Sequence, residues 1–163
     1  MESKAKLLGH PVHPMLIVLP LGLFIAAVVF DAIYLWRGSP AFATAAYWNI
    51  AAGVVGGLLA AVFGAIDWFA IPSGTRAKRI GLLHGGCNVV VVAIFALVWL
   101  MRGADGDTAP TTMLFLLEIV ALVLGSVAGW LGGELVDRLA VGVDDGAHLD
   151  APSSLSGRPA RQR

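Results

Sequence analysis

Long apolar segments alternate with short polar ones along most of this chain. A helix needs about 20 apolar residues to span the hydrocarbon core of a bilayer. Four segments reach that length, at residues 15–36, 45–69, 80–101 and 112–136. The stretches between them are short and carry Gly, Pro, Ser or charged residues. Because short connections force neighbouring helices to run antiparallel, the pattern predicts an all-α, integral membrane four-helix up-down bundle.

The composition agrees with a bilayer as the main partner. Of the 163 residues, 58% are hydrophobic and only 13% are charged, whereas average soluble chains carry about 25% charged residues. The formal net charge is zero, so a nucleic-acid partner has no electrostatic support. Cys87 is the only cysteine, which excludes an intrachain disulfide.

The distribution of lysine and arginine predicts the orientation in the membrane. Cytoplasmic flanks of membrane helices carry an excess of these residues. Nine of the eleven fall on one side: Lys4, Lys6, Arg76, Lys78, Arg79, Arg138, Arg158, Arg161 and Arg163. Arg37 and Arg102 fall on the other side. We therefore expect both termini in the cytoplasm.

The chain divides into a membrane domain and a tail. Residues 1–143 form the predicted four-transmembrane-helix domain, and residues 144–163 follow it. The tail is acidic at first and then rich in Ser, Pro, Gly and Arg. Such a composition cannot bury a core, so we predict a disordered cytoplasmic tail.

A weak internal repeat relates the first two predicted helices to the last two. A shift of 71 positions lays His13 on His84, and a shift of 69 lays Gly56 on Gly125. Two hairpins running the same way form a parallel repeat about an axis along the membrane normal. Apolar segments also resemble each other by chance, so the repeat stays one of two interpretations. In a true repeat, the two histidines face each other at one depth.

Glycines recur four positions apart, at residues 53 and 57, 81 and 85, and 125, 129 and 133. Such faces let helix backbones approach closely in lipid. The alternative interpretation is that Gly85 and Gly86, next to His84, leave room for a flat cofactor.

His10 and His13 stand in a His-Pro-Val-His-Pro motif immediately before the first apolar segment. A residue that precedes proline avoids the α region, while Pro14 suits the first helical position. Pro20 lies inside the first span and should kink it. The motif is either a rigid cap that holds two imidazoles near the bundle axis, or a helix start whose histidines lie among the headgroups.

Further polar residues are expected at the depth of these histidines. His84 lies about one turn inside the third predicted helix, and Asn88 follows at i+4 on the same face. Asp67 ends the second helix, where a carboxylate can accept an imidazole N–H and fix the tautomer. The candidate cofactor-binding residues are His10, His13, Asp67, His84 and Asn88.

Several cofactors are compatible with this set. Two imidazoles from facing helices can be axial ligands of a b-type haem. Zinc or copper takes three or four ligands, for which His10, His13 and His84 are the candidate metal ligands, with Asp67. The outer half of the predicted bundle carries no histidine, so at most one cofactor is expected. Haem b, a transition metal and no cofactor all stay open.

Two acids lie in the outer half instead. The helical rise of about 1.5 Å per residue places Asp31 and Glu118 within several ångströms of each other in depth. They either share a proton as elements of a proton relay, pair with Arg37, or act as polar contacts between helices; Asp31 could also simply lie at the membrane interface.

The motifs together resemble the bacterial predicted membrane proteins known as domain of unknown function 2231. The resemblance covers residues 7–143 and is carried by the His-Pro-Val-His-Pro start, by Asp67-Trp68, by His84 and by Gly129-Trp130-x-Gly132-Gly133. It implies four spans in a bacterial cytoplasmic membrane, with no settled activity. Relatives joined to a Rieske iron–sulfur domain imply a link to electron transfer. This chain lacks the cysteine and histidine pairs of that domain, so an iron–sulfur or quinone-linked redox partner would be a separate protein.

Two functions of different classes follow. The first is a redox subunit of the cytoplasmic membrane with one haem b or metal at the histidines. The alternative is a non-catalytic scaffold, whose glycine faces build a homo-oligomer or dock a partner subunit. No Ser-His-Asp grouping, phosphate loop or glycosidase-like carboxylate pair supports an enzyme activity of its own.

Overall fold

Each predicted apolar segment lies inside one long helical stretch. The structure is a computed structural model that describes residues 1–103 and 108–161. Within these ranges, four stretches are long and apolar enough to cross a membrane: Val12–Arg37, Pro40–Ala70, Arg76–Gly103 and Thr112–Arg138. They consist of α1 (Val12–Leu16), α2 (Val18–Arg37), α3 (Pro40–Ala70), α4 (Arg76–Gly103), α5 (Thr112–Gly133) and a π-helical turn, η1 (Glu134–Arg138). The all-α four-helix membrane bundle is thereby confirmed.

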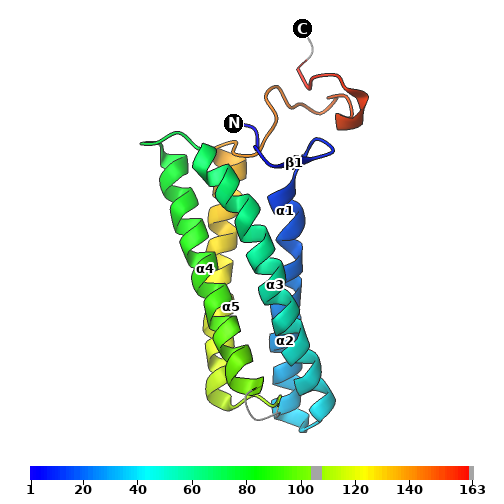
Figure 1. Cartoon of the computed structure of the whole chain (residues 1–163), viewed down its shortest axis with the longest axis vertical. Helices are drawn as coiled ribbons and strands as arrows, with labels where there is room; N and C mark the ends of the chain where they lie inside the picture. The colour runs from blue at the N-terminus through cyan, green and yellow to red at the C-terminus, as the bar shows by residue number, and fades with distance from the viewer. Residues whose placement is uncertain (104–107, 162–163) are drawn as a thin grey trace.

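The helices run up and down in sequence order (Figure 1). Helix α2 packs most extensively on α3, and α4 on α5, while α3–α4 and α2–α5 contacts join the two hairpins. Helices α2 and α4 therefore lie on one diagonal of the bundle. Both chain termini and the α3–α4 connection lie at one end, called the terminal end below. The α2–α3 connection, the end of α4 and the start of α5 lie at the opposite end, called the hairpin end below.

Local sequence explains where the helices begin and end. Gly38 adopts a left-handed φ of 71° that ends α2, and Pro40 then starts α3 at a position where its missing N–H has no cost. Helix α3 consequently begins before residue 45, where the apolar run starts. At the start of α4, the side-chain hydroxyl oxygen of Thr75 accepts a hydrogen bond from the backbone N–H of Lys78. At the start of α5, the hydroxyl oxygen of Thr111 accepts one from the backbone N–H of Leu114. Residues 104–107 of the predicted connection 102–111 lie outside the described residues.

The first span is interrupted at Ile17, between α1 and α2. Pro20 follows three residues later. Its ring has no N–H to donate to the carbonyl of Leu16 and sterically disfavours that carbonyl's helical position. The interruption therefore lies where a kink caused by Pro20 is expected.

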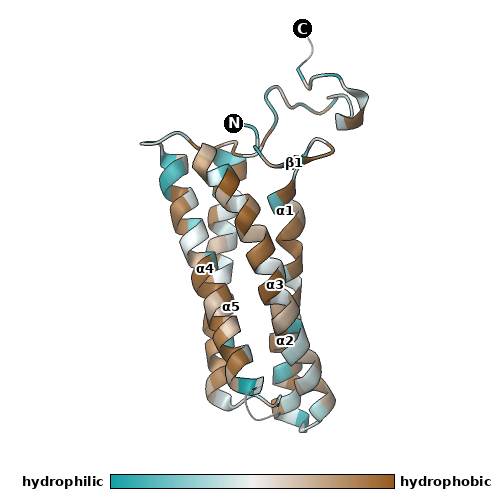
Figure 2. Cartoon of the chain, in the orientation of Figure 1, coloured by the Kyte–Doolittle hydropathy of each residue, from teal (hydrophilic) through white to brown (hydrophobic). Residues whose placement is uncertain are grey.

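The outward faces of the helices are apolar. Large side chains such as Leu21, Val55, Leu83 and Val120 are each more than half exposed. Figure 2 shows apolar residues along the length of the helices, with polar residues mainly toward the two ends. Exposing such apolar faces to water would be unfavourable, whereas lipid tails are as apolar as these side chains.

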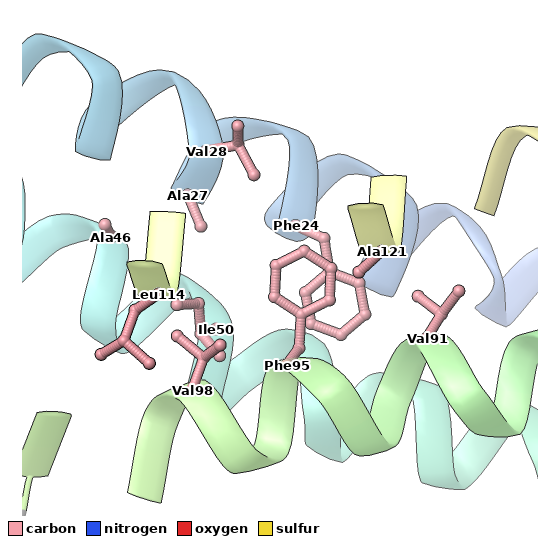
Figure 3. Packing of buried hydrophobic residues seen from close by; sticks show 10 residues of the cluster. All are labelled: Phe24, Ala27, Val28, Ala46, Ile50, Val91, Phe95, Val98, Leu114 and Ala121. Carbon is pink, nitrogen blue, oxygen red and sulfur yellow. The ribbon is translucent and has the colours of Figure 1, made fainter. Parts of the chain in front are cut away.

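The interior is built from small residues around one aromatic pair. The rings of Phe24 and Phe95 stack with centroids 4.0 Å apart and planes 3° from parallel, and Figure 3 shows them at the centre of the buried cluster. A Cβ at Gly53 would lie 2.6 Å from the Phe24 ring. The missing side chain therefore lets α2 and α3 approach closely.

The glycine faces differ in their surroundings. A Cβ at Gly57 would meet Val92 at 2.8 Å, and one at Gly81 would meet Trp68 at 2.7 Å. At Gly85 and Gly129, by contrast, an added Cβ would meet no described atom within 4 Å. The face at Gly53 and Gly57 is thus fully used for packing within the chain, whereas the faces that contain Gly85 and Gly129 are used only in part.

The segment before α1 folds over the terminal end. Strand β1 (Lys6–Leu7) pairs antiparallel with β2 (His10–Pro11). The Lys6 ammonium donates to the carboxylates of Asp144 and Glu2, and these hydrogen bonds raise the pKa of Lys6. The tail carries a short 3-10 turn, η2 (Ser154–Ser156). The disorder predicted for residues 144–163 stays a prediction, and residues 162–163 lie outside the described part.

We expect Gly53→Ala to lower the thermal stability of the purified protein. The new methyl group would press on the Phe24 ring, which cannot yield freely because it is stacked on Phe95. Overpacking of this kind costs about 1–3 kcal/mol. Gly22→Ala is the matched control, since its Cβ would meet no described atom within 4 Å. Thermal unfolding in detergent measures both, and equal transition temperatures for the two variants would contradict the packing argument.

Candidate functional site

Two histidines are held in the same way by the helix beside each of them. The Nδ1 atom of His13 lies 2.8 Å from the carbonyl oxygen of Ala60 on α3. The Nδ1 atom of His84 lies 2.8 Å from the carbonyl oxygen of Ala128 on α5. A carbonyl only accepts hydrogen bonds, so Nδ1 must donate in both rings. In a neutral imidazole, the lone pair is then on Nε2.

A glycine one turn further along gives each ring access to its carbonyl. A Cβ at Gly64 would lie 2.9 Å from the His13 ring, and one at Gly132 would lie 3.1 Å from the His84 ring. These glycines come four positions after Ala60 and Ala128. Any larger residue would cover the carbonyl, whose second lone pair is free to accept the imidazole N–H.

The two rings meet each other between the hairpins. Their centroids lie 6.2 Å apart, with the planes at 85°. The side-chain amide nitrogen of Asn88 lies 3.3 Å from Nε2 of His84 and donates to the His84 carbonyl at 2.9 Å. Asn88 thus lies where its i+4 spacing placed it. The structure brings together His13, His84 and Asn88 from the predicted set.

The other two predicted residues lie apart from this pair. His10 is exposed, and its Nε2 is 3.3 Å from Ser154 Oγ in the tail. The Asp67 carboxylate accepts from the Ser3 hydroxyl at 2.8 Å and from the Lys4 backbone N–H at 2.7 Å. The acceptors for the imidazole N–H groups are therefore backbone carbonyls rather than Asp67. Within residues 1–103 and 108–161, no three His, Cys, Asp or Glu side chains are grouped to hold a metal ion.

The contacts across the bundle axis follow the internal repeat. Three pairs of residues 71 positions apart meet there: His13 with His84, Phe24 with Phe95, and Asp31 with Arg102. All three join α1 or α2 to α4. In the second helix of each hairpin the shift is 68, as Ala60 with Ala128 and Gly64 with Gly132 show. The match of Gly56 with Gly125 predicts a shift of 69 for these helices, one residue more than the shift between the two histidine-binding carbonyls.

The third pair belongs to a buried cluster of charged groups near the hairpin end. Arg102 Nη1 lies 2.6 Å from Asp31 Oδ2, and Arg102 Nη2 lies 2.9 Å from Asp31 Oδ1. Glu118 Oε1 lies 3.3 Å from the same Nη1. All three side chains are fully buried. Asp31 therefore pairs with Arg102 rather than with Arg37, whose guanidinium lies over the Trp36 ring.

Backbone oxygens complete the surroundings of the guanidinium. Arg102 donates to the carbonyls of Ala43 at 3.1 Å and of Thr108 at 2.8 Å. A buried ion whose partner is removed costs about 3–5 kcal/mol. The cluster therefore ties α2, α3 and α5 to the end of α4.

Sequence reasoning missed Arg102, Ala60 and Ala128. Arg102 follows an apolar run directly and was assigned to a polar connection. The two alanines carry no polar side chain, so only their backbones take part. A signal for them does exist, because Ala-x-x-x-Gly recurs at 60–64 and 128–132 with the shift of 68.

Comparison with known protein families gives one match. A family model described as "Predicted membrane protein (DUF2231)" matches residues 9–145. The chain belongs to this family. The match includes both histidines, all four membrane stretches and the buried charged cluster. Searches of curated proteins and of solved structures gave no match.

We expect Nδ1 of His13 and of His84 in this DUF2231 protein to carry the ring proton in a lipid bilayer, because each faces a carbonyl oxygen. Nitrogen-15 NMR of labelled histidine distinguishes this tautomer from the Nε2–H form. His13→Gln and His84→Gln should each remove one such signal. Gly132→Ala should displace the His84 ring and reduce the Nδ1–H population, whereas Gly129→Ala, with open space around its Cβ, should not. A dominant Nε2–H form in the unmodified protein would contradict the hydrogen bonds to Ala60 and Ala128.

Proposed function

We propose that this membrane protein is a redox subunit that binds one b-type haem between His13 and His84. The observation that carries the proposal is the matched pair of imidazoles, one from each hairpin, each with Nδ1 held by a backbone carbonyl. A ligating histidine almost always donates its other ring N–H in this way, which fixes the ring and its tautomer. Bound haem would supply one-electron transfer.

The separation of the rings supports a shared metal. A metal–imidazole bond of about 2 Å on each side puts two ring centres about 6 Å apart when the rings lie on opposite sides of one ion. The observed centroid separation is 6.2 Å. The nearly perpendicular ring planes do not prevent His13 and His84 from holding one metal together, since each imidazole would bind through a single nitrogen.

Two further features favour haem over zinc or copper. Haem takes two protein ligands, and His10, the predicted third ligand, lies at the exposed surface beside Ser154. An added Cβ at Gly85 or Gly86, next to His84, would meet no described atom within 4 Å, so no packing contact within the chain explains these two glycines, and room for a flat macrocycle would. The excess of lysine and arginine at this end of the bundle supports a cytoplasmic position for it. An electron donor or acceptor, such as an iron–sulfur or quinone-linked protein, would approach there.

We expect the protein purified from a haem-producing host to show a Soret band with about one iron per chain. Absorption spectroscopy with elemental analysis measures both. His13→Ala and His84→Ala should each abolish the band, since each removes an axial ligand. His10→Ala and His148→Ala are matched controls on exposed histidines and should leave it unchanged.

Two outcomes would overturn the proposal. The first is a folded protein without a Soret band or stoichiometric iron after haem reconstitution. The second is a haem band that survives in the His13→Ala, His84→Ala double variant. A chain without any cofactor would favour the scaffold alternative, for which the open face at Gly129 is available. Gly129→Leu should then disrupt assembly, as measured by the mass of the detergent-solubilised complex.

A further inference from the structure

We propose that Glu118 is a buried proton-binding site, which holds a proton beside the Asp31–Arg102 ion pair and exchanges it with water at the hairpin end. This site is separate from the histidine pair and does not depend on a bound haem.

Charge balance is the first argument. Among the described residues, the charged groups that meet at this point are Asp31 from α2, Arg102 from α4 and Glu118 from α5, and the described contact from α3 is the uncharged carbonyl of Ala43. One cation thus faces two acids, all fully buried. An unpaired charge is very costly at this depth in a membrane. Binding one proton makes the cluster neutral.

The geometry assigns the proton to Glu118. Asp31 makes a two-pronged contact with Arg102, at 2.6 and 2.9 Å, which is the arrangement that an ionised carboxylate prefers. Glu118 reaches the guanidinium with one oxygen only, at 3.3 Å. Its other oxygen, Oε2, is buried and has no hydrogen-bond partner among the described residues. A neutral acid tolerates such a position better than an anion.

The cluster lies close to a route to water. Arg102 is the second-last residue of α4 and donates to the carbonyl of Thr108, in the connection to α5. Thr108 is partly exposed. This hydrogen bond links the buried cluster to a partly exposed residue at the hairpin end, whereas the stacked pair of Phe24 and Phe95 lies between the cluster and the histidines.

Infrared spectroscopy of the protein in lipid tests the proposal. At a pH of about 7, exposed acids are ionised, so a protonated carboxyl C=O stretch reports a buried neutral acid. We expect this band in the unmodified protein, with a shift on exchange into heavy water. Glu118→Gln should abolish it. Asp31→Asn should abolish it as well, because Glu118 is then the remaining acid among the described residues that contact Arg102, and it ionises to balance that charge.

The controls distinguish a proton on Glu118 from a proton on another acid and from a bound metal cation. Glu134→Gln changes a half-buried acid that pairs with Arg76 outside the cluster and should leave the band unchanged. Added sodium or potassium should also leave it unchanged. Absence of the band in the unmodified protein would overturn the proposal, and so would its survival in Glu118→Gln or Asp31→Asn. Loss of the band on adding salt would assign the site to a metal cation instead.

Discussion

The ion pair between Asp31 and Arg102 is the constraint on which the arrangement of the two hairpins depends. The first hairpin alone would leave Asp31 unpaired, at a cost of several kcal/mol, and the second alone would leave Arg102 with only its 3.3 Å contact to Glu118 among the described acids. Joining the hairpins satisfies both charges at once, and it does so in only one register because the contact is two-pronged. The apolar contacts between hairpins specify register less strictly, since small and branched residues pack in several offsets.

The same register produces the other contacts on the axis. His13, Phe24 and Asp31 have the same mutual spacing as His84, Phe95 and Arg102, so fixing one pair aligns all three. Two of the pairs join identical residues and one joins opposite charges. A symmetric dimer of one hairpin would bring two aspartates or two arginines together, which is unfavourable. A single chain with two related hairpins can hold different residues at equivalent positions, and the Asp31–Arg102 pair uses that freedom.

The sequence was sufficient for the bundle and for the meeting of His13 with His84. The lengths of the apolar segments predicted the four-helix bundle, and the internal repeat suggested that His13 and His84 face each other. Asp67 was expected beside the histidines because it lies at a similar depth in the membrane. Depth gives the height of a residue along its helix but not the direction of its side chain, and the Asp67 carboxylate in fact contacts Ser3 and Lys4. The role of Arg102 in the buried cluster was missed because this residue ends an apolar run, and a charged residue at such a position usually lies at the membrane interface. Its long side chain instead points into the bundle and pairs with Asp31. The carbonyl acceptors of Ala60 and Ala128 are backbone groups, so residue types alone do not reveal them.

The two ends of the bundle are nearly independent in electrostatic terms. His13 and Asp31 are separated by 18 positions, or about 27 Å along a helix. Two unit charges at that distance interact by about 0.6 kcal/mol at an effective dielectric constant near 20. An interaction of this size changes the proton-binding equilibrium of Glu118 by less than about threefold. A charge at the histidines is therefore too far away to decide whether Glu118 is protonated. Stronger coupling between electron transfer at the histidines and proton binding at Glu118 would need a change in helix packing. Such a change would have to involve the stacked rings of Phe24 and Phe95, which lie between the two sites.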